Sequence, residues 1–329
     1  MPDVKRGTDG AAVRFPAEFR GLLTGIALFG IAALVAIDGP SIVPGQELLQ
    51  SLRFHIAAAL LGLVALLFIS RAWWRGVLML VLVLASLGHG GLIIYRTQQD
   101  RWIYDGQTAE ASARVLSFNV LASNRRGADI AAYIIQTAPD VVFTMESNAV
   151  LPQLERIAAA FPYRAGCDAS GKDCDTMIFS RTPLTDVQVL PLKPFDRLRM
   201  VVAKTKIDGQ QVTLVGTHLS KPYFDESAWI ELYYLKRLLK TITGPVILAG
   251  DFNAAAWSEL VARFAADMGL VPPPHYPATW PIRLGPLGVP IDNMFTRDGA
   301  RIESIEAMAD PLGSNHRGLL ATVGLYRLD

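Results

Sequence analysis

Three long apolar runs without a charged residue lie within the first hundred residues. They cover residues 21–37, 54–70 and 76–95 and hold 17, 17 and 20 residues. A helix that crosses a bilayer needs about 17–25 such residues, so the pattern predicts three transmembrane helices. The alternative is that each run forms a buried core helix. A cleaved signal peptide would not account for the second and third runs.

The pattern changes from Ala111 onward, where short apolar runs alternate with longer stretches of helical periodicity. The dipeptide Asp208-Gly209 is typical of a tight turn between antiparallel strands. Strands mixed with helices and a hairpin predict an α/β (α+β) domain with mixed sheets. The predicted strands cover residues 114–119, 140–146, 176–180, 187–190, 199–206, 211–216, 246–249, 291–295 and 319–326, and the predicted helices cover 128–137, 150–161, 226–241 and 257–268.

Polar side chains recur near the ends of these strands. Asp251 and Asn253 follow the strand 246–249 after Gly250, a residue that permits a turn or a close backbone approach. An extended chain would place both side chains on one face at the ligand-binding edge of the sheet, and an Asx turn is the alternative. Carboxylates, amides and histidines at one edge suit a metal-assisted phosphate site. The other residues in such positions are Asn119, Glu146, His218, Asp292 and His316.

Composition and flanking charge bear on the topology. The chain is 51% hydrophobic with a mean hydropathy of +0.30, and the excess lies in the first 95 residues. The positive-inside rule places the N-terminus in the cytoplasm and everything after Tyr95 on the opposite side. We therefore expect a cytoplasmic segment 1–20, a transmembrane region 21–95, a linker 96–110 and an exterior domain 111–329. The basic residues that precede the first run or separate the second from the third are Lys5, Arg6, Arg14, Arg20, Arg71 and Arg75.

The two cysteines of the chain, Cys167 and Cys174, both lie in the expected exterior domain. Six residues separate them, including Gly171. A disulfide that closes so short a loop suits an oxidising compartment and would contribute about 2.5 kcal/mol by the loop-entropy model. Two unpaired buried thiols are the alternative.

The charge of the expected exterior domain bears on its substrate. From Gln107 to the C-terminus there are 22 Lys and Arg against 23 Asp and Glu, a net charge of 22 − 23 = −1. A non-specific binder of duplex DNA usually has a basic face, so this balance disfavours that class. Nucleic acids, nucleotides and phospholipid head groups all remain candidate substrates, and no obligate protein partner is indicated. Lys221, Tyr223 and Arg317 are the candidate substrate-binding residues beside the strand ends.

The order of short motifs along residues 110–329 resembles that of the endonuclease/exonuclease/phosphatase superfamily. This resemblance implies a four-layer sandwich of two stacked mixed β-sheets with helices on both outer faces. The apolar N-terminal region resembles that of bacterial membrane-anchored members, which implies the bacterial inner membrane and a periplasmic or extracellular catalytic domain. The motifs are Ser117-Phe118-Asn119, Met145-Glu146-Ser147, Gly216-Thr217-His218-Leu219, Gly250-Asp251-Phe252-Asn253, Ile291-Asp292-Asn293 and Gly313-Ser314-Asn315-His316.

The resemblance implies that part of the site binds a metal. Glu146 would bind the divalent metal, Mg²⁺ with Mn²⁺ as the alternative, and Asn119 would lie beside it. Asn315 stands where the family usually has a metal-associated Asp, so one negative charge is lost, which disfavours a second metal. Asn293 stands where the family often has His or Tyr, a departure of secondary importance.

The resemblance also implies the catalytic roles. Asp251 would position and activate the attacking water, and Asn253 would hold a phosphoryl oxygen. His316, oriented by Asp292, would act as base or charge stabiliser. His218 would contact the phosphate or protonate the leaving group.

The sequence therefore predicts a membrane-anchored, metal-dependent phosphoric ester hydrolase, foremost a phosphodiesterase or nuclease. One alternative is a phosphomonoesterase or phospholipase-like hydrolase that uses the same site. The other is a catalytically weakened domain that binds phosphorylated ligands.

Overall fold

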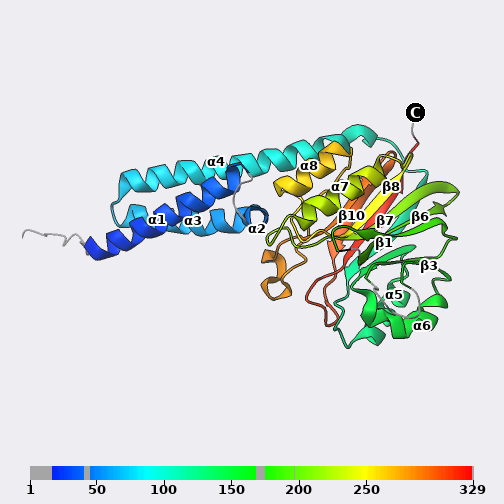
Figure 1. Ribbon diagram of the computed structural model, residues 1–329. Coiled ribbons are helices and arrows are strands. Elements are labelled where there is room, and N and C mark those ends of the chain that lie inside the picture. The colour runs from blue at the N-terminus through cyan, green and yellow to red at the C-terminus, as the bar shows by residue number, and fades with distance from the viewer. Residues whose placement is uncertain (1–16, 41–44, 168–174, 196, 328–329) are drawn as a thin grey trace, which may run out of the picture. The chain divides into compact units, whose positions relative to one another are not determined.

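The computed structural model describes residues 17–40, 45–167, 175–195 and 197–327, and the chain divides into two compact units (Figure 1). The first unit comprises Met1–Pro40 and Arg53–His89, and the second comprises Ser41–Leu52 and Gly90–Asp329. The second unit thus takes in a segment that lies between the first two apolar runs of the sequence.

The first unit contains α1 (Ala17–Asp38), α3 (Arg53–Ile69) and most of α4 (Trp73–Gln98). Within the described residues, the two helices Ala17–Asp38 and Trp73–Arg101 are long and apolar enough to cross a membrane, whereas α3 has 17 residues and is shorter. Many large apolar side chains of these helices are exposed, for example Phe29 at 78%. Such exposure is typical of a helix that meets lipid or a partner rather than a protein core.

A polar contact joins the helices of the first unit. The buried guanidinium of Arg53 donates from Nη1 to Asp38 Oδ1 at 2.7 Å and to the carbonyl of Ser86 at 3.1 Å. His89 Nδ1 lies 2.7 Å from the same oxygen of Asp38. A buried charge is tolerated only when it is paired in this way, so the contact holds α1, α3 and α4 together.

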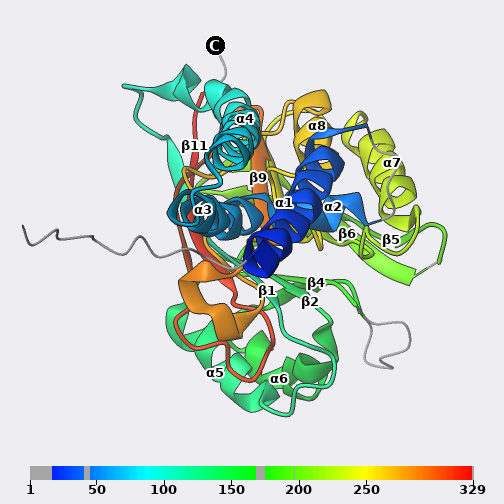
Figure 2. The same cartoon turned by 90° about the vertical axis from the view of Figure 1, so that its left-hand side faces the viewer.

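Two mixed β-sheets form the centre of the second unit (Figures 1 and 2). The six-stranded sheet has the order β10-β11-β1-β2-β4-β3 and the five-stranded sheet has the order β5-β6-β7-β8-β9. The pairs β1–β2 and β7–β8 are parallel, and their crossovers contain α5 (Gly127–Thr137) and α7 (Ser227–Leu239). The strands are β1 (Ala111–Asn119), β2 (Val141–Met145), β3 (Tyr163–Ala165), β4 (Met177–Ser180), β5 (Thr185–Leu192), β6 (Arg197–Ile207), β7 (Gln210–His218), β8 (Val246–Asp251), β9 (Asp292–Arg297), β10 (Ala300–Ala307) and β11 (Leu319–Leu325).

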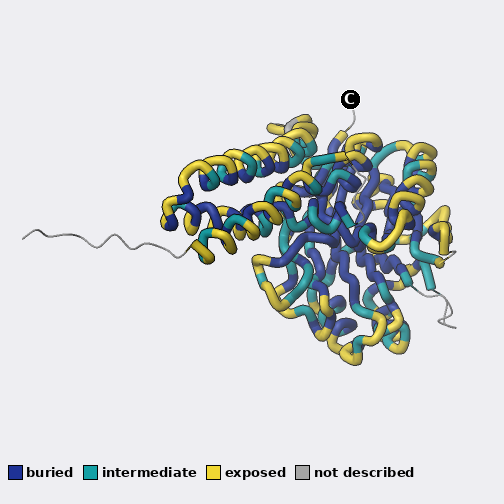
Figure 3. Tube along the Cα trace, turned by 60° about the vertical axis from the view of Figure 1, so that its left-hand side comes forward, coloured by how far each residue is buried: buried dark blue, intermediate teal, exposed yellow. Residues whose placement is uncertain are grey.

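The core of the second unit has three apolar clusters, which define four layers. One cluster joins the facing surfaces of the two sheets, with Phe143 from one sheet and Leu214 from the other. A second packs the five-stranded sheet against α7 and α8 (Glu259–Asp267). The third packs the six-stranded sheet against α5 and α6 (Leu154–Ala158). The predicted sandwich of two mixed sheets flanked by helices is thereby confirmed, and its buried strands appear dark blue in Figure 3.

Several local predictions need correction. The helix predicted over 150–161 is instead the 3₁₀ helix η2 (Ser147–Gln153) followed by the short α6, because Pro152 removes a helical donor. The strands β3 and β10 and the helix α2 (Gln46–Ser51) were not predicted. The segment predicted as a linker contains the end of α4 and the 3₁₀ helix η1 (Gln99–Tyr104). A further 3₁₀ helix, η3 (Ile282–Leu287), precedes β9.

The predicted disulfide involves one residue that lies outside the described residues. Cys167 is described and half-buried, whereas Cys174 falls in the gap between 167 and 175. The pairing of these cysteines stays a prediction.

Candidate active site

Seven polar residues from both sheets come together at one edge of the sandwich. Parallel β1, β2, β7 and β8 end at this edge, and antiparallel β4, β9 and β11 begin there. His218 pairs with Asp251 across β7 and β8, and Asp251 pairs with Asp292 across β8 and β9. A polar residue that follows a parallel strand therefore meets one that precedes an antiparallel strand. The seven residues are Asn119, Glu146, His218, Asp251, Asn253, Asp292 and His316.

The turn after β8 brings Asn253 back toward Asp251. Its backbone has a left-handed φ of 51°, and its N–H donates to Asp251 Oδ1 at 2.8 Å, which is the Asx turn. The extended chain that would have placed both side chains on one face ends at Asp251. Gly250 precedes this turn because a Cβ there would collide with the carbonyl oxygen of Thr217.

Asp251 lies between the imidazoles of two histidines. His316 Nε2 is 3.8 Å and His218 Nε2 is 3.7 Å from Asp251 Oδ2. His316 Nδ1 lies 2.8 Å from Asp292 Oδ2, so the second nitrogen of that ring is directed at Asp251. The two carboxylates and the two imidazoles in these contacts are all buried.

The second histidine is oriented in the same way by a residue that sequence reasoning missed. His218 Nδ1 lies 2.8 Å from Asp175 Oδ1, and the other oxygen of Asp175 pairs with Arg199 Nε at 3.3 Å. Two Asp–His pairs thus flank Asp251. Asp175 lies two residues before the start of β4, an antiparallel strand that begins beside the end of β2.

Burial and charge shift the titration of these groups. Burial raises the pKa of Asp251, and the negative charge of Asp292 raises it further against the opposing effect of the two histidines. Burial lowers the pKa of His316, but the charges of Asp292 and Asp251 outweigh it and raise that pKa from 6.5 to about 9. Burial also lowers the pKa of His218, and the charge and hydrogen bond of Asp175 reverse the shift, so the pKa is raised overall.

Glu146 stands across from this group at the end of β2. Its Oε2 accepts from the N–H of Ala122 at 2.9 Å, and its Oε1 accepts from Asn119 Nδ2 at 3.2 Å. Asn119 Nδ2 also donates to Asp251 Oδ2 at 3.0 Å, so this amide joins the two carboxylates. Glu146 has a left-handed φ of 53°, an unusual backbone for a long side chain that is often found at functional sites.

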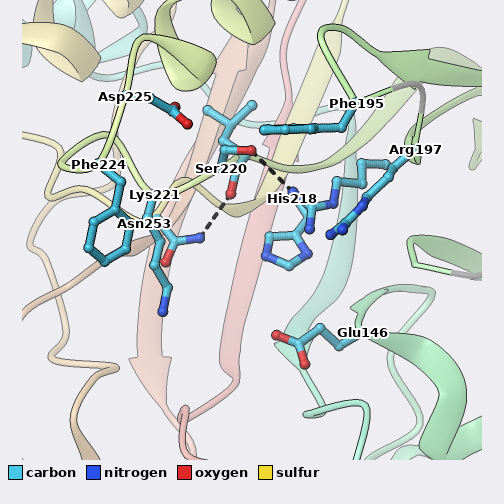
Figure 4. Close-up of a pocket in the computed structure, with 11 residues that line it drawn as sticks. Glu146, Phe195, Arg197, His218, Ser220, Lys221, Phe224, Asp225 and Asn253 are labelled. Carbon is cyan, nitrogen blue, oxygen red and sulfur yellow. Dashed lines mark hydrogen bonds between the residues drawn. The ribbon is translucent and has the colours of Figure 1, made fainter.

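A pocket of about 320 Å³ is lined by three of the seven residues, Glu146, His218 and Asn253. Figure 4 shows Glu146 on one side of it, His218 and Arg197 on another, and Asn253 with Lys221 opposite. Asn253 Nδ2 donates to the carbonyl of Leu219 at 2.8 Å, which fixes the amide at the wall. Cationic side chains and an amide beside the carboxylates of Glu146 and Asp225 suit a phosphate ester. The remaining lining residues are Phe195, Arg199, Leu219, Ser220, Phe224 and Asp225.

Other predicted site residues lie apart from the pocket lining. Asn315 is exposed. The guanidinium of Arg317 donates to the carbonyls of Met308 and Ala309 at 3.3 and 3.4 Å, which ties it to its own loop. Tyr223 is half-buried, and its pKa is raised by burial and by the charge of Asp251. Asn293 Nδ2 donates to the carbonyl of Ala254 at 2.9 Å and so braces the turn that carries Asn253.

Two sets of residues can hold a cation. Glu146 offers carboxylate oxygens at the wall of the pocket, and hard oxygen ligands are those that Mg²⁺ prefers. The ligand atoms of Asp251, Asp292 and His316 lie within 4.8 Å of one another and include an imidazole, which suits Zn²⁺ or Mn²⁺ better. His316 Nδ1 is already engaged by Asp292, so Glu146 fits a magnesium ion better than the buried trio does.

Sequence reasoning also missed residues that support the site from behind. Ser314 Oγ donates to the carbonyl of Asn119 at 2.7 Å and accepts from the N–H of His316 at 3.0 Å. Thr279 Oγ1 accepts from the N–H of Asp292 at 3.2 Å. Ser314 belongs to a motif that was recognised, whereas Thr279 carries no local sequence signal.

Comparison with known proteins shows which family the second unit belongs to. Residues 116–316 match the profile of the Endonuclease/Exonuclease/phosphatase family. A UPF0294 protein of Vibrio cholerae serotype O1 is 32% identical over 171 residues, which cover 50% of this chain. The match covers 57% of that relative's own length.

Three solved structures share the fold of the second unit. They are TDP2 of D. rerio with a single-strand DNA product, sphingomyelinase C from Streptomyces griseocarneus, and a mutant of beta toxin from Staphylococcus aureus with bound magnesium ions. Their TM-scores are 0.52, 0.51 and 0.51 at 18%, 21% and 18% identity. They cover 65%, 64% and 64% of this chain and 100%, 99% and 99% of their own. At these identities the likeness concerns the fold alone.

Proposed function

Because this chain belongs to the Endonuclease/Exonuclease/phosphatase family, we propose that it is a divalent-metal-dependent hydrolase of phosphate esters, foremost a phosphodiesterase or nuclease. The observation that carries this proposal is the placement of Asp251 between two histidines, each oriented through its Nδ1 by an aspartate. Such an arrangement suits proton transfer to and from the oxygens of an ester that is being hydrolysed.

Each residue of the site has a role in this proposal. Asp251 positions the attacking water and accepts its proton, a role that suits a buried carboxylate of raised pKa. His316, held by Asp292, stabilises negative charge on the phosphoryl group as an imidazolium. His218 donates a proton toward the leaving oxygen, and Asn253 donates to a phosphoryl oxygen.

Glu146 is the proposed ligand of the metal, which is Mg²⁺ with Mn²⁺ as the alternative. A bound divalent cation would offset negative charge on the phosphoryl oxygens. Asn119 orients the carboxylate of Glu146 through its amide nitrogen. The exposed Asn315 adds no charge, which favours a single metal.

The substrate is a phosphate ester from nucleic acid, nucleotide or phospholipid. Arg197, Arg199 and Lys221 make the pocket wall cationic, although the domain as a whole is nearly neutral. A local cationic wall suits one phosphate group rather than the long backbone of duplex DNA. TDP2 was solved with a DNA product and sphingomyelinase C is named for its lipid, so both chemistries occur on this fold.

The first test of this function is turnover by the full-length protein in detergent. We expect Mg²⁺-dependent hydrolysis of bis-p-nitrophenyl phosphate, complete loss with EDTA, and recovery when Mg²⁺ is restored. Glu146→Gln should raise the Mg²⁺ concentration needed for half-maximal activity, because it removes the proposed ligand charge. A parallel panel of p-nitrophenyl phosphate, single-stranded DNA and phospholipid vesicles then identifies the ester class. Binding of phosphate esters without turnover under Mg²⁺ or Mn²⁺ would instead favour a weakened binding domain.

We also propose that the catalytic unit is anchored to a bacterial inner membrane by three transmembrane helices. The segment Ser41–Leu52 belongs to the second unit although it lies between α1 and α3, which supports its placement on the same side of the membrane as the catalytic sheets. The chain would then cross the membrane an even number of times between this segment and residue 96. This favours one crossing by α3 and a second by α4.

The charge bias of the flanking residues completes the proposed topology. Residues 1–20 would be cytoplasmic, 21–95 transmembrane and 96–110 a linker, with the catalytic domain 111–329 in the periplasm or outside the cell. A disulfide between Cys167 and Cys174 would suit that compartment.

A reporter fused after Asp329 tests this topology. A reporter that is active only after export, such as an alkaline phosphatase domain, should be active there, because three crossings follow a cytoplasmic N-terminus. A second fusion in the short segment between α3 and α4, at Ala72, should be inactive and serves as the internal control. Activity of a cytoplasm-only reporter at Asp329 would contradict the topology.

A further inference from the structure

The short helix α2 carries an unusual set of buried polar residues. Gln46, Glu47, Gln50 and Ser51 are all buried, with Gln50 and Ser51 only 2% and 3% exposed. A helix of six residues is not stable in isolation, so its conformation depends on what it packs against. Buried polar groups in turn require hydrogen-bond partners.

The partners of Gln50 and Ser51 lie in the loop that follows Asp251. Ser51 Oγ accepts from the N–H of Ala255 at 3.0 Å, and the carbonyl of Ser51 accepts from Trp257 Nε1 at 3.2 Å. Gln50 Oε1 accepts from the N–H of Glu259, the first residue of α8, at 2.9 Å. One backbone donor and one indole donor of this loop, and the first backbone donor of α8, are thus bound by a segment about 200 positions earlier in the chain.

This loop connects the proposed catalytic residues to α8. Residues 252–258 are buried throughout, although they form no strand or helix. Asn293 Nδ2 donates to the carbonyl of Ala254 on one side, and on the other Ser51 Oγ accepts from the N–H of Ala255, which belongs to the same peptide group. The turn of Asp251 and Asn253 is therefore clamped between the catalytic sheet and α2.

A second contact anchors α2 without touching this loop. Glu47 Oε1 accepts from Trp229 Nε1 of α7 at 3.0 Å. Gly45, the residue before α2, approaches the backbone of Tyr223, because a Cβ there would lie 3.7 Å from the Tyr223 carbonyl oxygen. The segment 45–52 thus contacts the loop that contains Lys221 as well as the loop that follows Asp251.

We propose that Gln50 and Ser51, which lie between the first two apolar helices, are positioning residues of the active site. They act by holding residues 252–258 so that Asp251 and Asn253 keep their places relative to the pocket. This inference rests on the function proposed above. A misplacement of about 1 Å can lower a catalytic rate by about 10². The effect is expected on the chemical step, because Glu146 has no contact with α2 among the hydrogen bonds described.

The first test compares Ser51→Ala, alone and with Gln50→Ala, with the parent in the full-length protein. With bis-p-nitrophenyl phosphate and Mg²⁺, kcat should fall by about 10- to 100-fold in the double variant. The Mg²⁺ concentration for half-maximal activity should stay unchanged. Ser51→Thr keeps the hydroxyl acceptor and should recover most of the loss. The matched control Glu47→Ala removes the anchor on α7, and its kcat should stay within about threefold of the parent, well short of that loss.

A double-mutant cycle separates positioning from general destabilisation. In an Asp251→Ala background, Ser51→Ala should lower the residual activity by less than about twofold, because the group that it positions is gone. Equal fold-losses in the parent and Asp251→Ala backgrounds would overturn the inference. The inference would also be overturned if the activity losses of Ser51→Ala and Glu47→Ala both matched the loss of folded protein measured by thermal unfolding.

Hydrogen exchange tests the clamp without reference to activity. In the Gln50→Ala, Ser51→Ala double variant, amides of residues 252–259 should exchange faster, whereas those of β2 and Glu146 should keep the parent rate. Unchanged exchange over 252–259 would overturn the inference even if no substrate is turned over. A parent that hydrolyses no phosphodiester would count against the proposed function, and an active parent with unaffected variants would count against this inference alone.

Discussion

Asp251→Ala should lower the Mg²⁺-dependent turnover of a phosphodiester by about 10²–10⁴, the usual range for a general acid–base group. This loss corresponds to about 3–5 kcal/mol of transition-state stabilisation. The reason is geometric: Asp251 is the carboxylate that both histidines face, at 3.7 and 3.8 Å, and its Oδ1 also orders the turn through the N–H of Asn253. Initial rates at saturating Mg²⁺ and substrate measure the effect.

Two controls separate chemistry from folding in this experiment. Asp251→Asn keeps the shape and an oxygen that accepts from Asn253, so it should fold like the parent and still lose the same activity. Asp267→Ala removes an exposed carboxylate on α8 that pairs with Lys236, and it should leave turnover within about twofold, since surface pairs contribute little. The site assignment is wrong if Asp251→Ala and His316→Ala both remain within about threefold of the parent, far inside the expected range.

His316→Ala and Asp292→Ala should each lower kcat by about 10²–10⁴, and the double variant should be little worse than His316→Ala alone. Asp292 acts through the imidazole, because its Oδ2 lies 2.8 Å from His316 Nδ1 and both side chains are buried. Once the ring is absent, Asp292 has nothing to orient. The measurement is kcat for the two single variants and the double variant under one set of conditions. Losses that multiply in the double variant would contradict a pair that acts as a unit.

The same pair gives stability a defined pH dependence. The pKa of His316 is about 9 in the folded chain and 6.5 in the absence of its neighbours. Its contribution to the free energy of unfolding is therefore complete below pH 6.5 and is lost as the pH rises through about 9. Asp292→Asn removes the main charge that raises this pKa, so the decline in stability above pH 6.5 should flatten. Thermal unfolding midpoints across this pH range, measured in EDTA, check the sign.

Sequence alone determined the elements whose local pattern is unambiguous. The strand 141–145 and the strand 246–251 are short and apolar at almost every position, so they are buried on both faces wherever they lie in the fold. Asp251, the last residue of one strand, and Glu146, which follows the other, could be recognised for the same reason. The order of the motifs was enough to indicate the family, which residues 116–316 confirm.

Tertiary structure decided the residues whose role depends on strand direction. Asp175 precedes β4, and only the antiparallel pairing of β4 with β2 brings it to the edge where Glu146 lies. The pattern of apolar residues along a strand is the same in either direction, so it carries no information on which end meets the site. Arg317 illustrates the converse, because it is adjacent to His316 in sequence and is held by the carbonyls of its own loop.

The packing of α2 against the loop that follows Asp251 could not be predicted from the sequence. Gln50 and Ser51 look like ordinary polar residues between two apolar runs, and their partners lie about 200 positions away. The local periodicity of apolar residues indicates which face of a segment is buried. A buried hydrogen bond depends instead on which donor from a distant part of the chain the tertiary fold places next to the acceptor. The sequence thus determined the strands and the chemical groups at their ends. The packing of the two sheets decided which of those groups meet at one edge of the sandwich.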